Sequence, residues 1–204
     1  MSKEFSWGVL TGDVIGSRMA DPERWLTSLR QSLAAWGVEP RDWELYRGDQ
    51  FTCAVPATSA LQAAASIQAT VLAEAGVLVR IGVGIGSLTY RSDRATESQG
   101  TAFERSGEAF DSLKRSPFKM LTSNPEMNAE WGVILGFASR VLEGWTESAA
   151  GAVAVALRHP EASQGEWADR LGKSQSTVSE ALKRASFDEI SAMLRHFSAQ
   201  IASQ

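Results

Sequence analysis

The apolar residues in the first part of the chain follow two alternating patterns. Short runs of apolar, aromatic and β-branched side chains predict strands at residues 5–10, 43–46, 51–55, 77–85 and 118–121. Apolar residues at intervals of three and four predict helices at residues 21–37, 58–76 and 101–114. The predicted order is therefore β-α-β-β-α-β, followed by a further helix and strand.

This order is typical of an α+β protein with a ferredoxin-like core, in which helices cover one face of an antiparallel sheet. Gly48 and Asp49 stand between two strand patterns and predict a hairpin turn. In that fold the hairpin lies beside the first strand. We assign residues 1–124 to this predicted N-terminal domain.

Two carboxylates are the candidate chemical groups of this domain. A Thr-Gly-Asp turn is expected after the first strand, and it would bring Asp13 towards Asp49 in the adjacent hairpin. Converging carboxylates repel one another unless they share a proton or a divalent cation, so we predict an Mg²⁺ or Mn²⁺ site. The alternative is that Asp13 caps a loop and Asp49 only forms its turn.

Small residues next to Asp13 indicate a phosphate-binding turn. Gly12 and Gly16, with Ser17, allow a tight turn whose backbone N–H groups approach phosphate oxygens. These three residues are the predicted nucleotide-binding residues. No catalytic residue is assigned.

The remaining residues predict helices only. A helix at residues 129–143 either forms a connector, assigned to residues 125–145, or lines a homodimer interface. Ser163 and Glu166 form the sequence pattern of a capping box, Gly172 ends that helix, and Ser174 begins another. This spacing predicts a helix-turn-helix DNA-binding domain at residues 146–204.

The second of these helices carries side chains that can contact DNA. Gln bonds adenine edges, Ser bonds bases or phosphates, and Lys and Arg meet the backbone. The predicted DNA-binding residues are Lys173, Ser174, Gln175, Ser176, Thr177, Ser179, Lys183 and Arg184. Glu180 on the same helix is either selective for cytosine or repels DNA, and a pair of helices that binds protein is the alternative.

Composition limits the classes of protein to consider. The 204 residues carry a net charge of −4, so a nucleic-acid partner must be argued from a local element. The one cysteine, Cys53, excludes an internal disulfide, and no apolar run is long enough for a membrane span. The polar N-terminus does not resemble a signal peptide, so we expect a cytoplasmic protein without a membrane partner.

Four blocks in order resemble the SatD family of bacterial proteins: GVLTGDVIGSR, LYRGDQF, VRIGVGIG and GTAFERSGEAFDSLK. The N-terminal part of that family is similar to the palm-like catalytic domain of class III nucleotide cyclases. The resemblance implies that Asp13 and Asp49 stand where two aspartates of the cyclases bind two metal ions. The segment GKSQSTVSEALKR also resembles the recognition segment of bacterial winged-helix and related regulators.

One helix departs from the cyclase pattern. Where the cyclases carry an asparagine and an arginine, this chain has Glu104 and Glu108, and Arg105 lies one position off. Carboxylates there would oppose the charge that develops on a triphosphate. We therefore expect a DNA-binding transcriptional regulator, with a cyclase-like domain that senses a nucleotide or only assembles a homodimer. The alternatives are a divergent metal-dependent nucleotide-processing enzyme that uses Asp13 and Asp49, and a scaffold that binds another protein.

Overall fold

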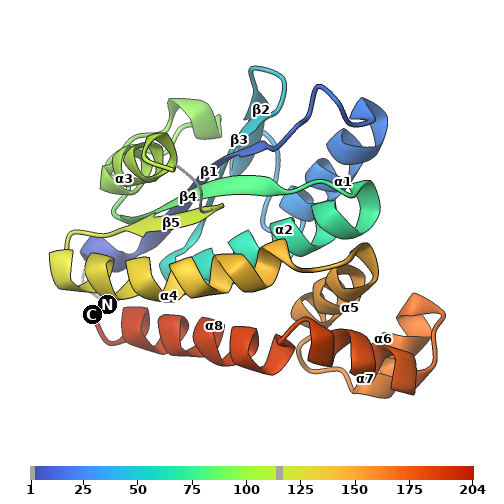
Figure 1. Ribbon diagram of the computed structural model, residues 1–204. Helices are drawn as coiled ribbons and strands as arrows, with labels where there is room; N and C mark the ends of the chain where they lie inside the picture. The colour runs from blue at the N-terminus through green and yellow to red at the C-terminus, as the bar shows by residue number, and fades with distance from the viewer. Residues whose placement is uncertain (1–2, 114–116) are drawn as a thin grey trace.

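The computed structural model describes residues 3–113 and 117–204 and has an α+β architecture (Figure 1). Its described residues form one five-stranded mixed sheet and eight α-helices, with three short 3-10 helices. The strands are β1 (Trp7–Val14), β2 (Trp43–Tyr46), β3 (Gln50–Pro56), β4 (Val79–Gly86) and β5 (Phe118–Leu121). The helices are α1 (Pro22–Ala34), α2 (Ala60–Ala75), α3 (Thr101–Asp111), α4 (Pro125–Glu143), α5 (Glu147–Arg158), α6 (Gln164–Leu171), α7 (Gln175–Arg184) and α8 (Phe187–Ala202).

Local signals set most of these boundaries. The Asp21 side chain accepts a hydrogen bond from the Glu23 backbone N–H, and Pro22 occupies the first helical position of α1. Gly76 ends α2 in the left-handed conformation, as predicted. The second helix begins later than predicted, because Thr58 lies in a 3-10 turn and α2 starts at Ala60.

The strand order in the sheet is β2-β3-β1-β4-β5. β1 pairs antiparallel with both β3 and β4, and β4 pairs parallel with β5. The hairpin predicted around Gly48 and Asp49 joins β2 to β3. β1 is therefore an interior strand with hydrogen-bonded neighbours on both sides.

The predicted turn at Thr11-Gly12-Asp13 is wrong, because β1 continues to Val14 and the turn begins at Ile15. Gly12 is paired with Phe51 on one side and Ile81 on the other. A Cβ at Gly12 would lie 2.6 Å from the Phe51 ring. Gly12 thus permits close packing inside the sheet, which sequence spacing cannot distinguish from turn chemistry.

Helices cover both faces of the sheet, so the expectation of helices on one face is wrong for α3 (Figure 1). Alternate residues of β4 explain the position of α3. A Cβ at Gly82, Gly84 or Gly86 would come closer than 3.0 Å to the backbone of α3. The absence of side chains lets α3 lie directly on the strand. The large residues of β4 point to the other face, where they pack with α2.

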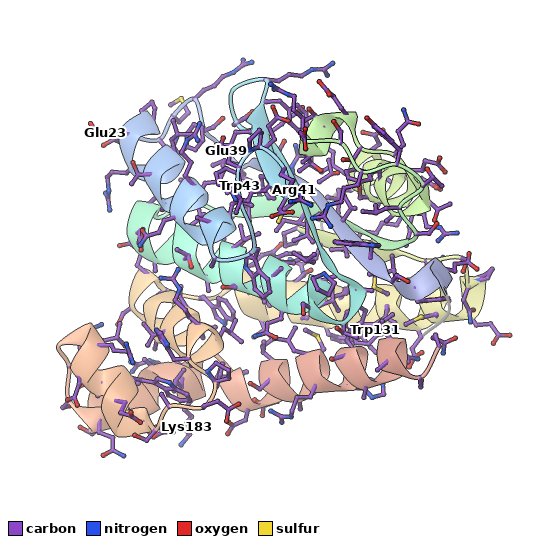
Figure 2. All side chains as sticks on the ribbon, turned by 180° about the vertical axis from the view of Figure 1, so that it is seen from behind. Glu23, Glu39, Arg41, Trp43, Trp131 and Lys183 are labelled. Carbon is purple, nitrogen blue, oxygen red and sulfur yellow. The ribbon has the colours of Figure 1, made fainter. Side chains whose placement is uncertain are left out.

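The C-terminal helices extend the core on the α2 side. α5 packs on α2, and α4 packs on β5 and runs beside α8 (Figure 1). Trp131 of α4 is fully buried; its Nε1 donates to Gln200 Oε1 at 2.7 Å, and its ring meets Phe197 edge-on at 5.2 Å. Figure 2 labels Trp131 between α4 and α8. One continuous cluster of buried apolar residues therefore runs from the sheet to α8.

Within the described ranges, none of the helices combines the length and the apolar character that a membrane crossing requires.

The close contact between α3 and β4 gives a test of the fold. We expect Gly84→Ala to lower the free energy of unfolding by about 2 kcal/mol or more, because the new methyl group meets helix backbone. Gly107→Ala on α3 is the matched control. A Cβ there meets nothing within 4 Å, so the change should stabilise by about 0.5–1 kcal/mol. Urea unfolding measures both, and equal effects of the two changes would contradict this packing.

Candidate functional site

Polar residues lie in two rows across the face of the sheet that α3 partly covers. Residues that are paired in register share a face, because side chains alternate along each strand. The first row is Tyr46, Gln50, Asp13 and Arg80, and the second is Glu44, Thr52, Thr11 and Gly82. We call these eight positions, seven polar residues and Gly82, the polar sheet face. The β2–β3 hairpin and two strands distant from it in sequence, β1 and β4, supply these residues.

Asp13 and Arg80 form the central ion pair of this face. Arg80 Nε donates to Asp13 Oδ1 at 2.9 Å, and Arg80 Nη2 donates to Asp13 Oδ2. The guanidinium also lies 5.6 Å from the centroid of the Phe110 ring of α3. The pKa of Arg80 is raised, chiefly by its hydrogen bond to Asp13, with added contributions from the charges of Asp13 and Asp49.

Asp49 lies in the β2–β3 turn and is tied to the turn after β1. The Ser17 hydroxyl donates to Asp49 Oδ2, and both side chains are partly buried. Together with Gly16, Arg18 and Arg80 they line a hollow of about 470 Å³. The structure thus brings together Asp49, Gly16 and Ser17 of the predicted residues, whereas Gly12 lies inside the sheet and does not line this hollow.

Arg80 bears directly on the predicted metal site. Both oxygens of Asp13 accept hydrogen bonds from its guanidinium, so a metal ion at Asp13 would compete with that group for the carboxylate. In residues 3–113 and 117–204, no three or more His, Cys, Asp or Glu side chains gather in a group that could hold a metal. The pairing of Asp13 with Asp49 around a metal stays a prediction. The sequence-based prediction missed Arg80. Its signal was a charged residue inside the otherwise apolar run VRIGVGIG.

The α3 residues that were compared with the cyclases are either exposed or held in a structural contact. Glu104 and Glu108 are exposed. Arg105 Nη1 donates to the Ile85 carbonyl at 2.8 Å, and its Nη2 bonds Glu4 at 3.2 Å. Arg105 therefore fastens α3 to the end of β4, which is a structural role.

A second hollow, of about 630 Å³, lies between the polar sheet face and α3. Glu44 is buried there, bonded by Arg94 and by the Thr96 hydroxyl at 2.6 Å. Thr52 Oγ1, also lining this hollow, has no hydrogen-bond partner among the described residues. Burial raises the pKa of Tyr46 above its usual value. No sequence pattern predicted that Glu44, Thr52 and Tyr46 lie together, because only the pairing of the strands brings them to one place.

The second candidate site is the α6–α7 unit. Ser163 and Glu166 form the predicted capping box: Glu166 Oε2 accepts from the Ser163 N–H at 2.8 Å, and Ser163 Oγ accepts from the Glu166 N–H at 3.3 Å. The pKa of Glu166 is lowered, first by that backbone hydrogen bond. Gly172 turns the chain with φ +60°, and Ser174 Oγ accepts from the Thr177 N–H at 3.2 Å to begin α7.

A small apolar core holds these helices together. Trp167, Val178 and Leu182 are buried, Leu171 is half-buried, and Trp167 Nε1 donates to the His159 carbonyl at 2.9 Å. α5 contacts both α6 and α7. Sequence reasoning missed α8, which packs on α7 and returns along the molecule (Figure 1).

The predicted DNA-contacting side chains lie on the outer side of this unit. All eight are exposed except Ser179, which is half-buried, and Figure 2 labels Lys183 at this surface. Lys173 Nζ donates to Ser148 Oγ at 3.0 Å, and Ser174 acts as the N-cap of α7. Glu180 is exposed among them. The structure brings these predicted residues together on one helix and the turn before it.

Comparison with models of known protein families found no match, and comparison with curated proteins found none either.

The Arg80 ion pair gives a test of the metal prediction. We expect Arg80→Met to bind Mn²⁺ about tenfold more tightly than the unchanged protein, because the cation that competes for Asp13 is removed. Water-proton relaxation by Mn²⁺ measures the affinity. Arg91→Met is the control, since Arg91 pairs with Asp42 and stacks on Trp7, away from Asp13. If Mn²⁺ does not bind Arg80→Met, the two carboxylates are not a metal site.

Proposed function

We propose that the chain is a DNA-binding transcriptional regulator whose α6–α7 unit is a helix-turn-helix. The observation that carries the proposal is the exposed polar and basic surface at the start and outer side of α7. There, Lys173, Gln175 and Ser176 are exposed beside a helix whose apolar side is fully packed.

The local geometry supports α7 as the helix that enters a major groove. A short turn through left-handed Gly172 separates α6 from α7, and both pack on α5. Gln175, Ser176 and Ser179 lie at helical spacing for contacts with base edges. Lys183 and Arg184 follow in the last turn of α7, where they serve phosphates.

Charge limits how this surface binds DNA. Glu180 is exposed on α7, and in residues 160–204 acidic residues slightly outnumber basic ones. Non-specific binding depends on neutralising phosphates, so it should be weak here. A homodimer would supply a second recognition helix and raise affinity for a paired site, and we include it in the proposal.

For the N-terminal part we propose a ferredoxin-like, cyclase-like domain of the SatD type. The order β2-β3-β1-β4 within the sheet supports it, with β5 as an added parallel strand. Its proposed task is to sense a nucleotide or to assemble the dimer. A regulator of this kind acts in the cytoplasm.

The second candidate is a divergent metal-dependent nucleotide-processing enzyme that uses Asp13 and Asp49. The hollow that holds Asp49 and Ser17 favours it, because Arg18 and Arg80 also line it and can meet phosphates. In this reading a metal ion competes with Arg80 for the Asp13 carboxylate. Incubation with each nucleoside triphosphate and Mg²⁺ or Mn²⁺ tests it, and the absence of product in every mixture would count against it.

DNA binding is tested by selection from a random duplex library with the full chain, followed by titration of the selected site. We expect Lys183→Ala to weaken binding about three- to tenfold, and to reduce the salt slope by about 1 because one phosphate contact is lost. Gln175→Ala should instead reduce discrimination between selected and altered sites by about 1–3 kcal/mol.

Arg41→Ala is the matched control, because it removes one exposed positive charge far from α7 (Figure 2). It should leave both affinity and salt slope unchanged. Recovery of no preferred sequence, or binding that does not change with salt, would contradict the proposal.

A further inference from the structure

A third hollow, of about 640 Å³, lies between α2, α5 and the end of α6. Other residues line the two hollows beside the sheet, so this one is separate from them. Its volume is within the range of small-molecule sites. The apolar residues that line it are Ala73, Ala154, Val155 and Leu171.

A buried hydroxyl group of α2 faces this hollow without a partner. Thr70 is 2% exposed, and its Oγ1 has no hydrogen-bond partner among the described residues. Thr70, Ala73 and Glu74 lie on one side of α2, because they are three and four residues apart, and all three line the hollow. A hydroxyl group buried without a hydrogen bond costs free energy, so a polar ligand atom beside Thr70 would remove that cost.

Two arginines from different helices also line the hollow. Arg158 is the last residue of α5, and Trp167 Nε1 of α6 donates to the next carbonyl, that of His159, at 2.9 Å. Arg170 follows Trp167 by three residues, which is about one helical turn. Both arginines therefore lie close to the contact that joins α6 to the end of α5.

Neither arginine forms an ion pair within the described ranges. Glu166 accepts from the Ser163 N–H, and its pKa is lowered first by that hydrogen bond and least by the charge of Arg170. The helix dipole favours a basic residue in the last turn of a helix, which accounts for each arginine alone but not for two that line one hollow. Their guanidinium groups are free to bind phosphate oxygens.

The acidic residues of this hollow lie at its other end. Glu147 is in the first turn of α5, and a Cβ at Gly76 would lie 2.9 Å from its Oε1, so this carboxylate lies over the end of α2. Glu74 belongs to the last turn of α2. Glu147 and Arg158 are eleven positions apart in α5, about 16 Å along its axis. A phosphate group beside Arg158 is therefore remote from Glu147.

We propose that this hollow binds a small phosphorylated molecule, with its phosphate group held by Arg158 and Arg170 and the rest of the molecule bonded to the Thr70 hydroxyl. Lys173, a predicted DNA contact, also lines the hollow, where it donates to Ser148 Oγ. The ligand would thus lie next to the proposed DNA-binding surface. Its binding does not depend on DNA.

Isothermal titration calorimetry of the full chain with pyrophosphate, at constant ionic strength and without divalent metal, tests the phosphate site. We expect saturable binding that Arg158→Gln and Arg170→Gln each weaken about tenfold or more, because each removes charge-assisted hydrogen bonds. Arg41→Gln is the matched control, because it removes one exposed positive charge elsewhere. The control should leave the affinity unchanged, and far-UV circular dichroism checks that each variant is folded.

A panel of phosphate monoesters tests the rest of the hollow. We expect at least one ester to bind more tightly than pyrophosphate and to lose about fivefold in affinity in Thr70→Val, because valine has the shape of threonine without the hydroxyl. Urea unfolding of ligand-free Thr70→Val should show no loss of stability, since the hydroxyl has no partner there. A panel in which no ester binds more tightly than pyrophosphate would overturn the inference.

The absence of pyrophosphate binding, or binding that both arginine variants retain, would also overturn it. Loss of binding in Arg18→Gln alone would place the anion in the hollow that Asp49 lines. Arginine variants that weaken only the binding of DNA would assign Arg158 and Arg170 to the DNA backbone, against the inference. DNA is measured separately, so a chain that binds pyrophosphate at this site but no DNA contradicts only the proposed function.

Discussion

The direct contact between α3 and β4 is the constraint on which the rest of the structure depends. Three alternate residues of β4 are glycines, so the backbone of α3 lies where side chains would otherwise stand. The large residues of β4 then face the opposite side, and a single apolar cluster grows there through α2 to α5 and α8. Among the described residues, α3 is the α-helix that covers one face of the sheet, and the C-terminal helices lie on the other (Figure 1).

The sheet face that α3 partly covers can hold polar groups with a small desolvation penalty, because part of it stays in contact with water. There, Asp13 and Arg80 meet across neighbouring strands, and Glu44 is buried with hydrogen-bonding partners. Arg80 neutralises a carboxylate that a metal ion would otherwise have to balance. β4 therefore supplies both the glycines on which α3 packs and the arginine that sets the charge of the polar sheet face.

The C-terminal helices pack on the same apolar core as the sheet. α4 and α7 each have a surface that does not contribute to this core. In both helices one side is buried and the other carries side chains without a role in the core, Phe137 on α4 and Gln175 on α7. The proposal for DNA binding rests on the exposed surface of α7.

The sequence by itself determined the features that depend on neighbouring residues. Asp21 and Ser163 begin helices, Gly172 ends one, and Gly48 with Asp49 turns the hairpin, because capping and turn chemistry act over a few residues. Only the tertiary structure decided that β1 runs through Gly12, that Arg80 binds Asp13, and that α3 lies on its own face of the sheet. Each of these depends on contacts between segments distant along the chain, and local residue patterns do not show which of those distant segments lie side by side.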